Sequence, residues 1–462
     1  MSPTSTGVIA AAQTAAALLS VRVPLAIALA LAAFLVLFAA LEGCARRGLL
    51  SPEATRKLLH TGSGLLTLSF PFVFHDFWPV LLLTSASAGL LAIVRFVPLV
   101  RGRLAGVTTR VGRVSLGELY FPLSVALLFW LTLGRDPLLF IIPILVLTLA
   151  DATGALVGVR YGLTPYSGTS KSLEGSVAFA AVAFLCIHVP LLAWSDVGRV
   201  ESLLIAATLA LLVMLLEGSA WRGLDNLFIP IGGYLLLRSY LGLDATALGA
   251  RFAVTSGLVA LIVFYRMRTT LEDDSLVAGA FFCYVAWATM GWEWLVAPLA
   301  VLAGHSRLSP PTAENSRRMH GVPVVFSIWL AAVGWLVLAR ITGRSELLFP
   351  YTVVFAAHLA MFGFSRLAHQ FPHRGLGGLF WRAVGASCAI VIVPFAIVAS
   401  SSVVNVPMAL SAVATIALGT LAFAVMQPVR HAPLTGARWL CQGSAAAVAS
   451  VLAWVGVSIA AG

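Results

Sequence analysis

The stretch PLLFIIPILVLTLADATGALVGVRYG (Pro137–Gly162) decides the fold, because it joins a long apolar run to a carboxylate. Fourteen uncharged residues, Pro137–Ala150, precede Asp151. A mostly apolar run of about 20 residues is long enough to cross a bilayer as a helix. A carboxylate at membrane depth is costly, so it is expected to face the interior of a helix bundle and to have a partner or a metal. The stretch therefore predicts a membrane helix that carries a functional group.

The rest of the chain repeats the apolar part of this pattern. Of its 462 residues, 60% are hydrophobic and 10% are charged, which argues against a soluble multidomain protein. We predict an all-α, polytopic integral membrane helical bundle with about 16 transmembrane helices. The predicted spans are residues 21–43, 58–75, 78–94, 118–134, 137–157, 173–194, 201–217, 226–240, 245–265, 275–290, 292–304, 321–340, 347–364, 383–400, 406–426 and 439–460.

Basic residues in the loops predict the orientation of the chain. Loops after odd-numbered spans carry most of the arginines, and loops after even-numbered spans carry few. Because cytoplasmic loops are enriched in Lys and Arg, we place the N-terminus outside and the odd-numbered loops in the cytoplasm, in a bacterial inner membrane. The net charge of +11 is attributed to basic loops beside anionic lipid, and no nucleic-acid partner is expected.

A charged junction, RMRTTLEDD at residues 266–274, divides the chain. Nearly all of the unusual polar residues at the membrane edge precede it. We therefore predict a catalytic membrane domain at residues 1–268 and a C-terminal domain of seven spans, without an assigned role, at residues 269–462. The oligomeric state is not predicted.

Four polar segments all fall on the predicted cytoplasmic face, so they are expected to form one site. Sidedness was assigned from the loop arginines, so this convergence is partly independent evidence. The segments are RKLLHTGSG (Arg56–Gly64), GELYFP (Gly117–Pro122), ADATGALVGVRYGLTPYSGTSKSLEGS (Ala150–Ser176) and EGSAWRGLDNLFIP (Glu217–Pro230).

The segment GTSKSLEGS holds Lys171, one of only two lysines in the chain; the other is Lys57. Lysines and arginines together number 29, so the remaining 27 are arginines. A Gly- and Ser-rich loop before a helix suits phosphate, and lysine adds a compact point charge. An ordinary capping loop, with Ser172 as N-cap and a solvated lysine, is the alternative. The glycines after Asp151 are either a helix-packing seam or a surface for a nucleotide. The predicted nucleotide-binding residues are Arg56, Gly158, Gly162, Ser170, Lys171, Ser172, Gly175 and Ser176.

Several acids accompany these basic groups. Mg²⁺ prefers one or two carboxylates together with phosphate oxygens, and the predicted metal ligands are Asp151, Glu174, Glu217, Asp225 and Asn226. Ion pairs with loop arginines are the alternative for each acid. The predicted catalytic residues are Lys57, His60, Asp151, Lys171 and Glu174. This set suits phosphoryl or nucleotidyl transfer to a lipid hydroxyl, which depends on positioning and charge neutralisation.

The order of these motifs resembles the polyprenol kinase family, which includes dolichol kinase, phytol kinase and the CTP-dependent diacylglycerol kinases. The resemblance covers residues 50–265 and is greatest to the phytol kinase branch, through SKSLEGS (Ser170–Ser176) and GLDNLFIP (Gly223–Pro230). It implies transfer of the terminal phosphate of CTP, or of another nucleoside triphosphate, to a lipid alcohol. It also implies that a nucleotide and metal site contains Asp151, Lys171, Ser172, Glu174 and Gly175. The seven additional spans depart from the family pattern.

Two other functions remain open at this point. A phosphatidate cytidylyltransferase-type enzyme also uses CTP, Mg²⁺ and a lipid, but the acidic C-terminal motif expected of that class is absent. A transporter for an anionic lipid or metabolite would carry broken helices at mid-membrane, whereas the polar residues here gather at one face.

Overall fold

The computed structural model describes residues 5–97, 116–167, 169, 171–220, 223–308, 320–399, 406–429 and 435–461. Within these residues the secondary structure is helical, with two isolated β-bridges and no strands. The all-α prediction is confirmed, and a helix covers most of each predicted span. Eleven described helices are long and apolar enough to cross a membrane. The chain is therefore an integral membrane protein, and the count of about 16 spans stays a prediction.

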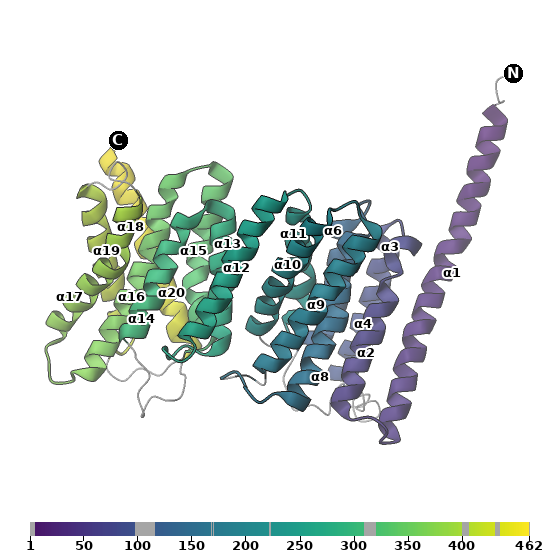
Figure 1. Cartoon of the computed structure of the whole chain (residues 1–462), viewed down its shortest axis with the longest axis horizontal. Coiled ribbons are helices and arrows are strands. Elements are labelled where there is room, and N and C mark those ends of the chain that lie inside the picture. Colours follow the sequence, from purple (N-terminus) through teal and green to yellow (C-terminus); the bar gives the residue numbers. More distant parts are fainter. Residues whose placement is uncertain are drawn as a thin grey trace. The chain divides into compact units, whose positions relative to one another are not determined.

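The chain forms two compact units (Figure 1). Unit 1 comprises residues 1–165 and 171–252, and unit 2 comprises residues 166–170 and 253–462. The division falls inside helix α12, Ala245–Tyr265, ahead of the boundary expected after residue 268. The assignment of separate roles to the two domains stays a prediction.

Unit 1 contains ten α-helices before α12, among the residues that the structure describes. They are α1 (Ser5–Arg46), α2 (Pro52–Thr67), α3 (Phe70–Val73), α4 (Phe77–Phe96), α6 (Gly117–Thr132), α7 (Leu138–Leu145), α8 (Asp151–Tyr161), α9 (Leu173–Trp194), α10 (Arg199–Ser219) and α11 (Asp225–Tyr240). Helix α1 begins well before the expected Val21, because the alanines that precede it favour helix. Helix α6 packs between α4 and α11, and α9 packs against both α8 and α10.

A π-helical turn, Val146–Ala150, joins α7 to α8 within one membrane-length segment. Pro143 lies inside α7, where it lacks the N–H that a regular helix would use. A π-turn inserts an extra residue into the helical ladder and is frequent at functional sites. Here the turn ends directly before Asp151, so the carboxylate begins a new helix where the sequence predicted one continuous span.

The contact between α8 and α9 requires glycine. A Cβ added to Gly175 would lie 2.8 Å from the carbonyl oxygen of Gly154 and 3.2 Å from the Cα of Gly158. A Cβ added to Gly154 would lie 3.0 Å from the Gly175 carbonyl oxygen. Small residues at three- and four-residue spacing let two helix backbones approach this closely. The described contacts of these glycines are therefore those of a helix-packing seam, and a role in nucleotide binding stays a prediction.

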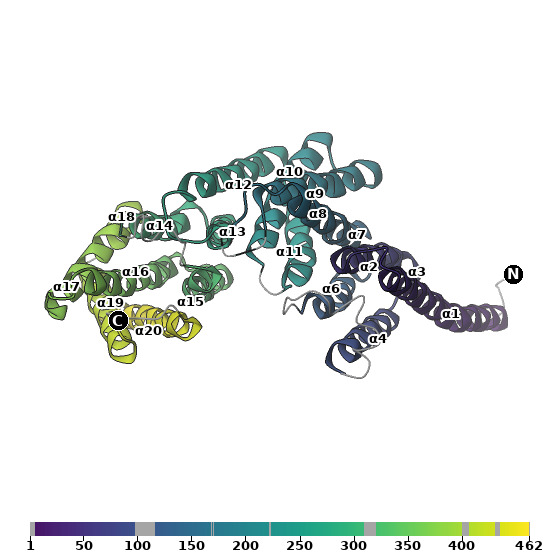
Figure 2. The same ribbon diagram turned by 90° about the horizontal axis from the view of Figure 1, so that it is seen from below.

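Unit 2 is built around α16 (Leu348–Gln370), which is buried along most of its length. In its most apolar 18-residue window, 94% of the residues are buried, as expected for a central helix. Figure 2 shows α15, α17, α19 and α20 around it. The other helices are α13 (Asp273–Met290), α14 (Val296–Leu308), α15 (Val322–Thr342), α17 (Leu376–Ser387), α18 (Val393–Val398), α19 (Val406–Met426) and α20 (Gly436–Ala461).

Candidate functional site

Lys57 and Asp151 form a buried ion pair. The Lys57 Nζ lies 2.6 Å from the Asp151 Oδ2, and each residue is only 8% exposed. The two groups come from α2 and from the first residue of α8. The partner expected for the deep carboxylate is therefore a lysine, one of the two in the chain. An ammonium and a carboxylate can remain charged away from water only if they neutralise each other.

His60 lies one turn after this lysine on α2. Its Nε2 is 3.9 Å from the Asp151 Oδ2 and 3.3 Å from the carbonyl oxygen of Leu147. On its other side, its ring packs edge-on against Phe121 of α6, with ring centroids 4.8 Å apart. If Nε2 donates its hydrogen to the Leu147 carbonyl, Nδ1 is left as a hydrogen-bond acceptor.

The π-turn is held by the polar face of α2. The Thr61 hydroxyl donates a long hydrogen bond of 3.5 Å to the carbonyl oxygen of Thr148, beside the bond of His60 to Leu147. Gly64 lets this face come close, because a Cβ there would clash with the Thr148 side chain. The motif RKLLHTGSG therefore supports the turn that positions Asp151, in addition to supplying Lys57 and His60.

The second lysine, Lys171, pairs with Glu217 at the end of α10. Its Nζ lies 2.8 Å from the Glu217 Oε1, and it also donates to the Glu217 backbone carbonyl. Burial disfavours the ammonium form, but the Glu217 and Asp225 carboxylates outweigh that effect and raise the pKa of Lys171 above its ordinary value. The alternative of a solvated surface lysine therefore does not hold, although Ser172 does cap α9 by accepting from the Gly175 N–H at 3.2 Å.

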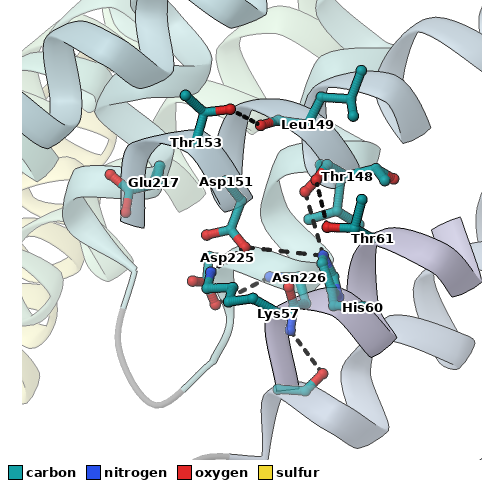
Figure 3. A network of polar contacts seen from close by, with 12 residues as sticks. Lys57, His60, Thr61, Thr148, Leu149, Asp151, Thr153, Glu217, Asp225 and Asn226 are labelled. Atoms are coloured by element: carbon teal, nitrogen blue, oxygen red, sulfur yellow. Dashed lines mark hydrogen bonds and ion pairs between the residues drawn. The ribbon is translucent and has the colours of Figure 1, made fainter. Parts of the chain in front are cut away.

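Asp225 and Asn226 open α11 after a tight turn at Gly223, whose φ of +90° strongly favours glycine. Asn226 donates from Nδ2 to the carbonyl oxygen of Gly117, at 2.8 Å, and so ties this motif to GELYFP. The Asp225 Oδ1 accepts from the Asn226 N–H. Figure 3 shows Asp151, Asp225 and Asn226 close to Lys57 and His60. Contacts between side chains or backbones therefore link all four motifs.

Three of the other predicted site residues lie where the end of α8 meets the start of α9. Ser172 is 6% exposed and Ser176 is 4% exposed, and both lie in the first turn of α9 or at its cap. A Cβ on Gly162 would meet the Ser172 hydroxyl oxygen at 2.8 Å, so that glycine closes the end of α8 against the cap. Ser170 lies outside the described residues.

Glu174 has a different environment from the other acids. Both of its carboxylate oxygens accept from the backbone N–H of Thr164, at 3.1 and 3.2 Å. Within the part of the chain that the structure describes, no contact joins it to Asp151, Glu217 or Asp225. Its observed task is to hold the loop that leads from α8 to the lysine.

The acids were tested as a metal site through their donor set. Among the described residues, no three His, Cys, Asp or Glu side chains are grouped to hold a metal ion alone. Asp151, Glu217 and Asp225 are nevertheless close enough for their charges to interact. Because Mg²⁺ prefers one or two carboxylates and completes its shell with phosphate oxygens and water, this donor set fits Mg²⁺ when a phosphate is also bound.

Two neighbouring pockets lie beside α2, and His60 lines one of them. The first is lined by polar groups, including Arg56, His60, Glu118 and Asn226. The second is mainly apolar and is lined from α1, α2, α3, α4 and α6. Ser63, Leu91 and Phe121 line both pockets. The first pocket is called the polar pocket, because charged and amide groups share its wall with apolar side chains, and it adjoins the more apolar second pocket.

Sequence reasoning missed several members of this site. Glu118, 4.0 Å from Arg95, lines the polar pocket, and its place in GELYFP was the available signal. Thr148, within the apolar run before Asp151, received no assignment. Pro143 and Thr148 in that apolar run indicate an irregular helix. The pattern does not predict that the irregular part is a π-turn.

The fold and the site together define a class: polytopic integral membrane proteins with a buried, charge-paired site at one end of a helix bundle. The chain is 33% identical, over 192 residues, to a phytol kinase from Synechocystis sp.. The match spans 40% of this chain and 79% of that relative. The chain therefore belongs to the polyprenol/phytol kinase family. No protein-family model matches the chain, and no solved structure matches it.

Proposed function

We propose that the chain is a membrane-embedded lipid-alcohol kinase. It transfers the terminal phosphate of CTP, or of another nucleoside triphosphate, to an isoprenoid alcohol such as phytol or a polyprenol. The observation that carries the proposal is the pairing of both lysines with carboxylates in one polar site. Phosphoryl transfer needs positioning and charge neutralisation more than covalent chemistry. The activity named for the Synechocystis relative supports the same reaction class.

Lys171 is the residue that binds the transferred phosphate. It faces the end of α10 from a helix-capping loop, and backbone N–H groups at the start of α9 lie beside it. Its ammonium group exchanges the Glu217 carboxylate for phosphate oxygens when the nucleotide binds. Asp151, Glu217 and Asp225 would hold Mg²⁺, which would neutralise part of the phosphate charge.

The alcohol lies with its hydroxyl in the polar pocket and its chain in the apolar one. Its oxygen forms a bond to the terminal phosphorus while the bond from that phosphorus to the bridging oxygen breaks. The nucleoside diphosphate leaves, and Nδ1 of His60 accepts the hydroxyl proton. Asp151, 3.9 Å from the His60 ring, stabilises the imidazolium that forms.

The orientation is part of the proposal. The active site faces the cytoplasm, where nucleotide is available, and the N-terminus lies outside. Attachment of a reporter to either end of the chain in bacterial cells tests this directly. A cytoplasmic N-terminus would overturn the orientation and would leave the reaction itself unaffected.

The decisive experiment uses the purified full chain with Mg²⁺, a panel of lipid alcohols, and CTP or ATP labelled in the terminal phosphate. We expect label in a lipid monophosphate, with a nucleoside diphosphate as the second product. Release of pyrophosphate with a nucleotide-linked lipid would instead indicate a cytidylyltransferase. If no lipid acquires label and no nucleotide is consumed, the kinase proposal is wrong.

A further inference from the structure

Unit 2 contains a pocket that the kinase site does not use. It lies among α13, α14, α15, α16 and the part of α12 that belongs to unit 2, with a volume of about 100 Å³. Leu276, Cys283, Trp329 and Leu359 are among its lining residues, and most of its wall is apolar. A space of this size holds several water-sized groups, so it can take the head and first carbons of a long-chain molecule.

Two buried histidines line this pocket with unmatched ring nitrogens. His305 is 7% exposed and His358 is 3% exposed. The Nε2 of His305 and the Nδ1 of His358 are buried and have no hydrogen-bond partner among the described residues. A buried polar group without a partner costs about 1–3 kcal/mol. Two such groups on one pocket wall indicate that something binds them.

The hydrogen-bond partners of the other two ring nitrogens indicate which kind of group the pocket lacks. The Gln442 amide Nε2 donates to the Nε2 of His358, at 3.3 Å, so the hydrogen of that ring is on the unmatched Nδ1. The Thr269 hydroxyl oxygen accepts from the Leu271 N–H and lies 3.3 Å from the Nδ1 of His305. If the Thr269 O–H donates to that Nδ1, the unmatched Nε2 of His305 also carries a hydrogen. With this tautomer of His305 the pocket presents two N–H donors and lacks an acceptor.

The ligand must supply an oxygen and must carry no charge. The side chains that line the pocket include no Asp, Glu, Lys or Arg among the described residues. A buried anion without a counter-charge would be expensive, whereas a hydroxyl oxygen can accept from an imidazole N–H. The remaining wall suits a hydrocarbon chain.

We infer that unit 2 binds a long-chain, uncharged lipid alcohol, with its hydroxyl oxygen accepting from His305 and His358 and its chain in the apolar pocket. This is a second lipid site, separate from the kinase centre of unit 1. It does not depend on the kinase reaction, so a variant that has lost phosphoryl transfer retains it.

The test uses the purified full chain in detergent and hexadecanol that carries a photoreactive diazirine. Mass spectrometry of the cross-linked peptides gives the site. We expect labelling of α13 or α16, displaced by unlabelled hexadecanol about a hundredfold better than by hexadecane, because each of the two hydrogen bonds contributes about one power of ten. Equal displacement by the two would mean that the pocket does not recognise the hydroxyl group. Labelling confined to exposed helix faces would mean that the alcohol does not enter the pocket. Either result would overturn the inference.

Two variants sharpen the result. Gly279→Leu fills the pocket, because a Cβ at Gly279 meets no atom within 4 Å and the residue lines the cavity, so specific labelling should fall at least about tenfold. Gly334→Leu is the matched control, since it adds the same side chain at an exposed α15 position with open space. Labelling that survives in Gly279→Leu, or falls equally in Gly334→Leu, would contradict the proposed site.

His358→Leu removes one donor without adding charge. We expect the preference for hexadecanol over hexadecane to drop about tenfold in this variant, while labelling at the pocket persists. An unchanged preference would show that the ring does not bind the hydroxyl. Repeating the measurement with Lys171→Arg separates the two proposals, because loss of kinase activity there should leave this preference intact.

Discussion

Units 1 and 2 both place polar side chains inside layers of apolar helices, but they treat charge differently. Unit 1 holds two ammonium groups, and each has a carboxylate partner. The pocket of unit 2 holds imidazoles with no carboxylate among its described lining residues. Because a buried charge needs a counter-charge and a neutral group needs only a hydrogen bond, the first arrangement suits phosphate and the second suits a neutral lipid.

The largest effect should come from breaking the buried pair of unit 1. Lys57→Met leaves the Asp151 carboxylate without its ammonium partner, and we expect the free energy of unfolding to fall by about 3–5 kcal/mol. Denaturant unfolding in detergent measures this loss. In the double variant Lys57→Met/Asp151→Leu, removal of both charges should restore much of the stability. If the single variant is as stable as the parent protein, the pair is not buried as described.

Removal of the charge of Asp151 alone tests catalysis as well as stability, because it leaves the buried Lys57 ammonium without its carboxylate. Asp151→Asn keeps the shape of the side chain but removes the carboxylate beside Lys57 and His60. We expect kcat to fall at least about a hundredfold, with the protein still in the membrane fraction. Asp244→Asn is the control, since Asp244 caps α12 and Asn caps equally well. Near-normal turnover in Asp151→Asn would exclude this carboxylate from the site.

A smaller effect should follow from changing the form of the second cation. Lys171→Arg keeps the charge, but a planar guanidinium cannot occupy the position of a compact ammonium group. We expect turnover to fall about tenfold with little change in unfolding, because Glu217 can still form an ion pair. Arg46→Lys, at the pair with Glu42 on α1, is the reverse exchange at a half-exposed position and should be silent. Full activity in Lys171→Arg would remove the special role of lysine.

The smallest effect should come from an exposed pair in unit 2. The side chains of Arg344 and Glu346 lie 2.7 Å apart but are 52% and 45% exposed. Glu346→Gln should change the free energy of unfolding by less than about 0.5 kcal/mol. Comparison with Lys57→Met therefore isolates burial as the cause of the difference. A loss as large as that of Lys57→Met would break the comparison.

The sequence predicted most of the fold and many of the residues that the structure brings together, but not the contacts among them. The lengths of the apolar runs predicted the helices, and the order of the motifs predicted the family. Glu174 was expected beside Asp151, yet its carboxylate binds the Thr164 N–H. Sequence spacing could not distinguish these outcomes, since the loop between α8 and α9 decides which way the first turn of α9 faces.

The sequence also could not predict which carboxylate pairs with each lysine. Lys57 and Asp151 are 94 positions apart, and Lys171 and the Glu217 backbone are 46 apart. No local periodicity relates residues at such separations, and four acids were available as partners. Packing of α2 on the π-turn, and of α10 beside the capping loop, selected one partner for each lysine.

The sequence by itself determined that this protein lies in a membrane, that its helices carry charge mainly at their ends, and that its two lysines belong to polar motifs. Those properties follow from the cost of exposing polar groups to lipid, which acts on each segment separately. The tertiary structure alone decided which charges neutralise each other, where α7 turns into α8, and that two histidines of unit 2 share a pocket. These features depend on the close approach of distant helices, which only packing fixes.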